Sequence, residues 1–598
     1  MLSRVGYPLG LALVICLGGC GDDSAGAGGI GGRGGTGGAG GSGGTTADAA
    51  TDGAPGDDGA SSMSDIGSAC TRMMCPSGTD MQNQGTCATG ERCIPPDETC
   101  GGGWVGGYCS QKCGRDNPGN PGCPGDARCV RLDQGSSSIY RCLKSCASHG
   151  DCRLPGAGYV CEATSVGPTC QPGRVCEQAP TTLPRGNWDG NRLVPGATPS
   201  TFESEGNAAT DGLGHVAISE IGIYRGGSVM AVAVYSEATA SFHTPVAYGE
   251  YPSTQYTSDP VVAYDVDVPG TVKPLYLVWL NIDLDAQSNP SNTHVMVAQS
   301  LDNGVTFGAP NNMATAAVNT LGQEVSGADS SGFIDKPWIA ASGGKVYVTY
   351  GLFTGAGGER MVWSGDGGRT WSAPRTMNNT SGFHNFGQVA VAGETGDVYV
   401  TYTDGNGLFG QRWRRSAAAT WFEPEVALPG SGNLVNPSGN AVTRDGSHFW
   451  AAWDDGTQRG SNILVSVAAN AGAAAPLSFG TPVTVNDDTS CGDHVHATVA
   501  LDASGRGHVL WLDDRYSGNL LGGVAHYAIS NDASGTSFST PVVVSDVVFP
   551  FTSSRIPGIW LGDYVGIAVA GTKVWASWAD ARGDNLKTHF YLSSRTIP

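Results

Sequence analysis

The sequence predicts an all-β fold in which a β-propeller follows a small disulfide-rich region and a disordered linker. Three observations predict it: short apolar segments that recur through the last two-thirds of the chain, a turn motif that repeats between some of them, and a cluster of cysteines before them. Radially repeated four-stranded sheets produce this recurrence of short strands and Gly-rich turns. The predicted parts are residues 1–19, 20–66, 67–178 and 179–598.

The first residues have the form of an export signal. Arg4 precedes an apolar stretch that ends in Leu17-Gly18-Gly19-Cys20 and is too short to span a bilayer as a helix. The segment resembles a bacterial lipoprotein signal, with an ordinary cleaved signal as the alternative. The resemblance implies a signal peptide over 1–19, acylation of Cys20, and a lipid-anchored protein of the bacterial cell envelope, at the outer membrane or cell surface.

Two regions of unusual composition follow the signal. Residues 20–66 are rich in Gly, Ser and Ala with almost no large apolar side chain, which predicts a disordered linker. Residues 67–178 hold most of the chain's 18 cysteines, a density that indicates disulfides formed in an oxidising compartment.

The cysteine spacing predicts two related disulfide modules in tandem, preceded by a third and poorer one. Cys109-x3-Cys113 and Cys142-x3-Cys146 each open a similar series. Zinc is the alternative, but Cys-x2-Cys pairs are absent from the sequence. An odd number of cysteines in this region and a single one beyond it predict a disulfide between the modules and Cys491.

Residues 179–598 carry the blade repeat. Seven strong strand cores recur there, which favours seven blades over six: 230–234, 275–279, 346–350, 398–402, 449–453, 508–512 and 574–578. The last repeat ends before a fourth strand. We therefore expect a strand within 200–220 to complete the last blade and close the ring.

A turn motif of the form Ser-x-Asp-x-Gly-x-Thr-aromatic occurs in two good copies and one looser copy. Asp and Ser side chains can bond turn amides, Gly provides a positive φ, and the aromatic ring can pack beneath the blade. The copies comprise Ser300, Asp302, Gly304, Thr306 and Phe307; Ser364, Asp366, Gly368, Thr370 and Trp371; and Asp532 with Phe538.

This motif resembles the Asp-box, or bacterial neuraminidase repeat, and residues 200–598 are similar to exported bacterial proteins of the sialidase superfamily. The resemblance implies a sialidase-like propeller with these turns between the third and fourth strands of each blade. The opposite face of the ring is then the expected ligand-binding face.

Polar residues recur where inner strands begin and second strands end, two positions that share the expected binding face. The starts carry Asp259, Asp335, Asn385, Asn436, Asp493 and Asp563, and the ends carry Glu237, Asn281, Asp404, Asp455, Asp513 and Asp580. Capping of nearby turns is the alternative role for any one of them.

Basic and aromatic residues lie beside these carboxylates in the sequence. Lys336, Trp338, Tyr564, Arg515 and Arg582 are the candidates to clamp a sugar or an acidic ligand. In the alternative, each Arg pairs with the Asp two residues before it and braces its blade.

Metal binding is a separate hypothesis. Asp493, His494 and His496 could ligate a metal, because alternate residues of a strand share a face. We expect no required cofactor, and Ca2+ is the ion that a ring of carboxylates would hold. The net charge of −21 disfavours nucleic acid as a partner and direct adhesion to anionic lipid headgroups.

For an active exo-sialidase the resemblance implies three arginines, a Tyr activated by a Glu, and an Asp acid. Tyr564, Asp335, Arg515 and Arg582 could fill some of these roles. However, the family's Arg-Ile-Pro motif belongs near the domain start, and here it lies at 555–557. The sequence therefore favours binding of an extracellular glycan or protein, with a glycoside hydrolase or a Ca2+-binding interaction scaffold as alternatives.

Overall fold

The computed structural model confirms the predicted all-β class and has seven propeller blades. Before residue 182 it describes 92–94, 108–110, 113, 123, 125–134, 137–148, 151–152, 159–162 and 167–172. From 182 to 597 it describes all residues except 197–201, 225–226, 249–254, 286–289, 312–321, 356, 381–383, 405–406, 418, 433–438, 456–460, 488–493, 517–522, 550–560 and 583–587. Cys20, Asn436, Cys491 and Asp493 lie outside the described residues.

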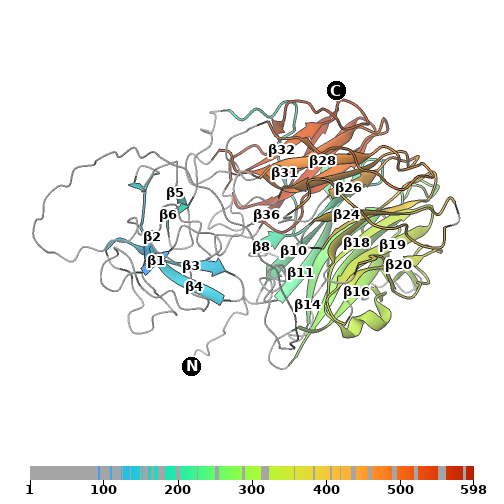
Figure 1. Ribbon diagram of the computed structural model, residues 1–598, viewed down its shortest axis with the longest axis horizontal. Helices are drawn as coiled ribbons and strands as arrows, with labels where there is room; N and C mark the ends of the chain where they lie inside the picture. The colour runs from blue at the N-terminus through green and yellow to red at the C-terminus, as the bar shows by residue number, and fades with distance from the viewer. Residues whose placement is uncertain are drawn as a thin grey trace, which may run out of the picture.

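Each blade is an antiparallel sheet (Figure 1), and in the first six blades the strands follow one another across the sheet in sequence order, whereas the outermost strand of the seventh comes from before the first blade. The first three blades comprise β8 (Phe202–Ser204), β9 (Ala208–Thr210), β10 (His215–Tyr224), β11 (Gly227–Ser236), β12 (Ser241–Phe242) and β13 (Val246–Tyr248); β14 (Gln255–Tyr264), β15 (Leu275–Leu284), β16 (Pro290–Ser300) and β17 (Gln323–Glu324); and β18 (Ile334–Ser342), β19 (Lys345–Leu352), β20 (Gly358–Ser364) and β21 (Arg375–Thr376).

The other four blades have the same order, apart from that outermost strand of the seventh. They comprise β22 (Asn385–Val391), β23 (Val398–Thr403), β24 (Leu408–Trp413) and β25 (Val426–Ala427); β26 (Gly439–Val442), β27 (Phe449–Asp454), β28 (Ile463–Ala468) and β29 (Val483–Thr484); β30 (His494–Leu501), β31 (Gly507–Asp513), β32 (Val524–Ile529) and β33 (Val542–Val543); and β34 (Gly566–Ala570), β35 (Lys573–Asp580), β36 (His589–Thr596) and β7 (Arg192–Leu193).

The core lies between neighbouring blades. One hydrophobic cluster joins the second and third blades, another joins the sixth and seventh, and a third joins the seventh to the first. Second strands such as β27 are buried along their whole length because a blade covers each of their faces. This double burial explains why six of the seven strand cores in the sequence mark second strands.

The first blade departs from the prediction in two ways. Residues 230–234 lie in its third strand, because the second strand, β10, carries Ser219 and Glu220 among its apolar residues. A strand from before the first blade does complete the seventh, but that strand is β7, paired with β36. The expected range of 200–220 was wrong, since those residues form the inner strands and the second strand of the first blade.

The repeated turns follow third strands, as expected. In the first copy, Asp302 accepts hydrogen bonds from the hydroxyl of Ser300 and from the amide and hydroxyl of Thr306, while the amide of Gly304 donates to Ser300 Oγ at 2.8 Å. Phe307 is buried beneath the turn.

The second copy has the same bonds, but the looser copy differs. Asp366 holds the amide and hydroxyl of Thr370. In the third copy the hydroxyl of Ser530 donates to the backbone carbonyl of Asp532, and the Asp532 carboxylate holds Ser534. The longer spacing before Phe538 thus changes the bonding pattern without moving the turn from the end of its third strand.

The cysteine modules have equivalent disulfides. Each module contains a hairpin, formed by β3 (Arg128–Gln134) with β4 (Ser137–Leu143) or by β5 (Tyr159–Glu162) with β6 (Thr169–Pro172). The bonds join Cys113 to Cys129, Cys123 to Cys142, Cys146 to Cys161 and Cys152 to Cys170. The shared pattern confirms a disulfide-rich region with two related modules in tandem. Cys142 was expected to open the second module, which was wrong, since it bonds Cys123 and belongs to the first. A further short pair, β1 (Arg92–Ile94) with β2 (Tyr108–Ser110), precedes them.

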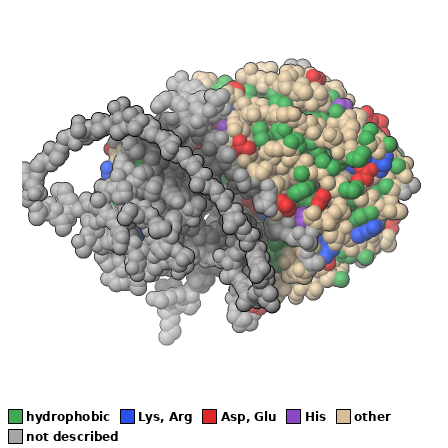
Figure 2. All heavy atoms as spheres, in the orientation of Figure 1, with side chains coloured by type: hydrophobic (Ala, Val, Ile, Leu, Met, Phe, Trp, Pro, Cys, Tyr) green, Lys and Arg blue, Asp and Glu red, His purple; other side chains and the backbone are tan. Residues whose placement is uncertain are grey.

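Within the described part of the chain no helix is long and apolar enough to span a membrane. A single 3-10 turn, η5 (Gly327–Ser331), precedes β18. On the face of the propeller shown in Figure 2, Lys and Arg side chains are scattered and do not gather into a basic patch.

Candidate functional site

The inner strands of four blades share a β-bulge near their start. The pairing register shifts after Ser258, Asp335, Asn385 and Val495. A bulge leaves an extra residue unpaired and re-aims its side chain. The residues with positive φ at these bulges are Asp259, Lys336, Phe386 and His496.

These bulges bring side chains from distant parts of the chain together at the axis. Lys336 Nζ lies 3.0 Å from Glu205 Oε1, 2.8 Å from Asp259 Oδ1 and 2.6 Å from Asp563 Oδ2. It also lies above the ring of Tyr564, 5.3 Å from the centroid. We call these five residues the axial cluster; they come from the first, second, third and seventh blades, and Lys336 is 1% exposed.

The cluster holds its carboxyl groups in different protonation states. Burial, followed by the charge of Asp259, raises the pKa of Glu205 well above its usual value. Burial also acts to raise the pKa of Asp563, but Lys336 and a hydrogen bond from Glu205 hold it below its usual value. Of the two groups, Glu205 therefore holds its proton to a higher pH than Asp563 does.

The pKa values of Lys336 and Tyr564 in the cluster are both raised. Burial opposes the charge of Lys336, yet the carboxylates around it raise its pKa well above the usual value. Burial raises the pKa of Tyr564 as well, so this phenol keeps its proton. His496 joins the edge of the cluster through a 3.0 Å contact between its Nδ1 and the backbone oxygen of Asp563.

Asp335 lies next to the cluster and points away from Lys336 Nζ. Its Oδ1 accepts the backbone amide of Lys336 at 2.9 Å, and Asn385 Nδ2 approaches its Oδ2 at 3.4 Å. Burial raises the pKa of Asp335 to about 8. The carboxylate therefore sits in the seam between the third and fourth blades.

The two Trp-x-Asp-x-Arg segments form braces within their blades. Arg515 donates through Nε and Nη2 to Asp513 Oδ2 at 2.9 and 2.7 Å. Arg582 donates in the same way to Asp580, with Nη2 2.6 Å from Oδ2. Trp511 and Trp578 add their indole N–H groups to these carboxylates. Both arginines are thus engaged with the Asp two residues before them.

The two histidines of the metal hypothesis face different neighbours. His494 contacts Ser461 and, through Nε2 at 3.1 Å, Asp513, whereas His496 lies at the axial cluster. The bulge between Val495 and Thr498 separates them, because it interrupts the alternation that would place both on one face.

Several residues that matter here were not identified from the sequence. Glu205 and Phe386 reach the cluster through the first and fourth blades, and Glu359 lies buried beside Asp335. At two of the four bulges the sequence offers a signal, the dipeptides Asp259-Pro260 and Lys336-Pro337, since a Pro inside a strand is tolerated at a bulge. Glu237, expected on this face, instead follows a third strand and pairs with Lys573.

A Tyr–Glu hydrogen bond of the kind that the sialidase resemblance implies exists away from the axis. Tyr402 Oη donates to Glu425 Oε2 at 2.6 Å. The bond joins β23 to the residue before the outer strand β25. It lies within one blade and does not involve Tyr564.

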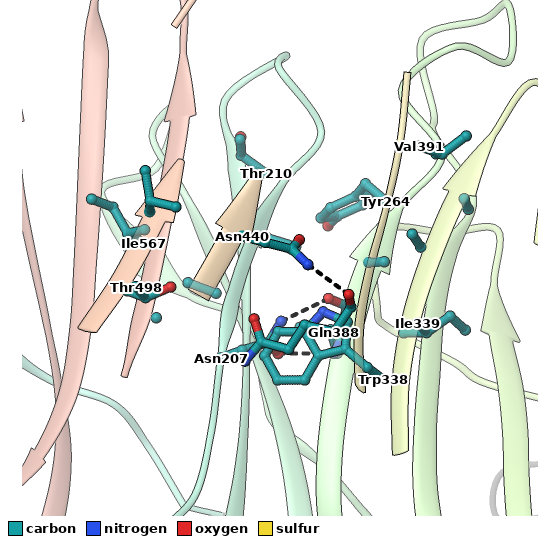
Figure 3. Close-up of a pocket in the computed structure, with 18 of the residues that line it drawn as sticks. Asn207, Thr210, Tyr264, Trp338, Ile339, Gln388, Val391, Asn440, Thr498 and Ile567 are labelled. Carbon is teal, nitrogen blue, oxygen red and sulfur yellow. Dashed lines mark hydrogen bonds between the residues drawn. The ribbon is translucent and has the colours of Figure 1, made fainter. Parts of the chain in front are cut away.

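A pocket of about 290 Å3 without charged lining residues lies between the inner strands and opens to the outside (Figure 3). Its polar lining consists of amide and hydroxyl groups together with the rings of Tyr264 and Trp338; the uncharged polar residues are Asn207, Thr210, Gln388, Asn440 and Thr498. Trp338 packs against Tyr564 with ring centroids 5.4 Å apart. The indole therefore separates the cavity from the axial cluster.

No protein-family model and no curated protein matches this chain. Among solved structures, it is similar to a polysaccharide lyase described as an ulvan lyase of a new family, with 11% identity, a TM-score of 0.40, and coverage of 68% of this chain and 95% of that one. It is similar to a leech intramolecular trans-sialidase, with 11% identity, a TM-score of 0.38, and coverage of 60% and 69%. It is also similar to NanB bound to Optactamide, with 10% identity, a TM-score of 0.38, and coverage of 70% and 71%. Similarity at this level does not establish a shared function.

Proposed function

We propose that this chain is an exported protein, anchored to the bacterial envelope through Cys20, whose propeller binds an extracellular glycan on the face that carries the axial cluster. The observation that supports the proposal is the convergence of carboxyl, ammonium and phenol groups from four blades around Lys336. Carboxylates accept hydrogen bonds from sugar hydroxyls, and aromatic rings pack against the apolar faces of sugars.

The charge of the site favours a neutral, hydroxyl-rich glycan over an acidic one. Three carboxyl groups surround a single Lys336 in the axial cluster. Arg515 and Arg582, the two candidates for an anion clamp, bond to carboxylates of their own blades. An acidic sugar would therefore meet more negative than positive charge. A protein ligand is the other partner that the sequence allows.

Glycoside hydrolysis is the second candidate function, and one observation favours it. Glu205 and Asp563 are neighbours whose pKa values move in opposite directions. Carboxyl pairs whose pKa values differ in this way can divide the roles of proton donor and base. Glu205 would be the acid and Asp563 the carboxylate.

A glycan array and a panel of fluorogenic glycosides, sialosides included, test both candidates on the purified chain. We compare the wild type with Asp563→Asn and Tyr564→Phe, and use Asp532→Asn on the opposite face as the matched control. Loss of array binding in the two cluster variants, with unchanged circular dichroism, supports binding at the axis. Binding that is unaffected by both variants contradicts it, and turnover that Asp563→Asn abolishes replaces binding with hydrolysis.

A further inference from the structure

The seam between the third and fourth blades holds oxygen atoms that the axial cluster does not use. Asp335, Gly351 and Glu359 are paired across β18, β19 and β20, so both carboxyl side chains flank a glycine on one face of the sheet. A Cβ on Gly351 would lie 2.5 Å from Asn385 Oδ1 and 3.1 Å from the backbone oxygen of His384. Four oxygen-bearing groups therefore surround the space above Gly351.

Two side chains of this group, Glu359 and Asn385, are buried with oxygen atoms that lack well-formed hydrogen bonds. Glu359 is 0% exposed and Asn385 is 3% exposed. Three oxygen atoms accept no well-formed hydrogen bond from the described residues: Oε1 and Oε2 of Glu359 and Oδ1 of Asn385. Burial raises the pKa of Glu359 well above its usual value, and the nearby backbone amide of Gly387 offsets only part of that rise. A bound cation could satisfy buried oxygens of this kind, and acceptors inside proteins are normally satisfied.

The backbone is shaped to bring Glu359 into this space. A Cβ at Gly387 would lie 1.9 Å from Glu359 Oε1, so only glycine permits the carboxyl group to approach the inner strand of the fourth blade. Asn385 orients its Nδ2 toward Asp335 and leaves Oδ1 facing Gly351. Two glycines thus create the room that the oxygen atoms line.

We propose that Asp335, Glu359, Asn385 Oδ1 and the backbone oxygen of His384 bind a divalent cation of the calcium type. Carboxylate, amide and backbone oxygens are the ligand set that Ca2+ accepts, with water completing six to eight positions. The four groups offer oxygen only, which disfavours zinc. Two carboxylates match the charge of the ion, and Lys336 Nζ is directed at the three other carboxyl groups of the axial cluster.

Such an ion would order the start of two inner strands beside the axial cluster. Asp335 precedes Lys336 in β18, and Asn385 precedes Phe386 in β22. The ion would therefore join the third and fourth blades next to the expected glycan site, and the inference does not depend on what that site binds.

The test is calorimetric titration of CaCl2 into the purified, EDTA-treated chain, together with thermal unfolding with and without Ca2+. We expect the wild type to bind Ca2+ and to melt at a higher temperature in its presence. Glu359→Gln should weaken Ca2+ binding about 10- to 100-fold. Gly351→Ala should weaken it too, since the new methyl group displaces Asn385 without changing any charge.

Asn385→Asp adds a negative ligand and should tighten Ca2+ binding, a result that a purely structural role would not produce. Glu394→Gln, on an exposed turn, is the control and should bind as the wild type does. The proposal is overturned if the wild type shows neither binding heat nor a Ca2+-dependent melting shift. It is equally overturned if Gly351→Ala and Asn385→Asp bind Ca2+ with wild-type affinity, even where Glu359→Gln fails to fold.

Discussion

Replacement of Lys336 by Met tests whether the axial cluster is a real network of charges. Met keeps the length of the apolar stem and removes only the ammonium group. The variant leaves the ionised Asp563 buried with no counter-charge, and Asp259 loses its contact as well. Removing one partner of a buried ion pair costs about 3 to 5 kcal/mol, so we expect the free energy of unfolding to fall by that amount at about pH 8.

The loss should depend on pH in a defined direction. Without Lys336, burial raises the folded-state pKa of these carboxyl groups above the unfolded value. A group with a raised pKa contributes stability at low pH and loses it as the pH rises through the folded-state value. The deficit of Lys336→Met should therefore be smaller at about pH 5 than at about pH 8.

Urea unfolding followed by Trp fluorescence measures both quantities. The matched control is Lys573→Met, which breaks an ion pair whose side chains are 39% and 29% exposed. Such a pair contributes about 0 to 1 kcal/mol, so the control should unfold almost as the wild type does. If Lys336→Met lies within about 1 kcal/mol of the wild type at both pH values, the buried charge network described here is refuted.

Three further outcomes follow from the contacts. Because burial raises the pKa of Asp335 to about 8, wild-type stability in EDTA should decline as pH rises from about 4 toward 8, and calorimetry should show a flatter profile for Asp335→Asn. Asp302→Ala should lower the free energy of unfolding by about 1 to 3 kcal/mol, measured in urea, and leave glycan-array binding intact. Arg582→Ala should cost about 3 to 5 kcal/mol because the buried Asp580 then keeps only two neutral donors, the Trp578 indole and the backbone amide of residue 582. Arg515→Ala should shift the thermal midpoint less, since two histidines remain on the carboxylate of Asp513.

The blade architecture was predictable because burial of second strands on both faces leaves a strong apolar signal. β27 reads Phe-Trp-Ala-Ala-Trp-Asp and is buried throughout, so its position in the sequence is unmistakable. The first blade gave a weaker signal, since β10 carries Ser219 and Glu220. The closing strand β7 could not be located in the same way, because two residues at the edge of a sheet carry almost no periodicity.

The sequence could predict which face of the ring carries the site, but it could not predict which side chains meet there. The turns at Asp302 and Asp366 lie after third strands, and the inner-strand starts lie at the other end of each blade. The sequence could not show that Asp335 turns into the seam while Lys336 reaches the axis. That division depends on the β-bulge, which no side-chain period encodes.

The backbone itself distinguishes the two faces of the ring. On the face of the repeated turns, positive φ falls mainly on glycines such as Gly304 and Gly368, where it costs little. At the inner-strand starts it falls on residues with large side chains, and these account for five of the seven described non-glycine residues with positive φ: Glu205, Asp259, Lys336, Phe386 and His496. Each such residue costs about 1 to 3 kcal/mol, and glycine would avoid that cost. Side chains kept at strained positions in several blades around one cluster are what the proposed use of this face for ligand binding would require.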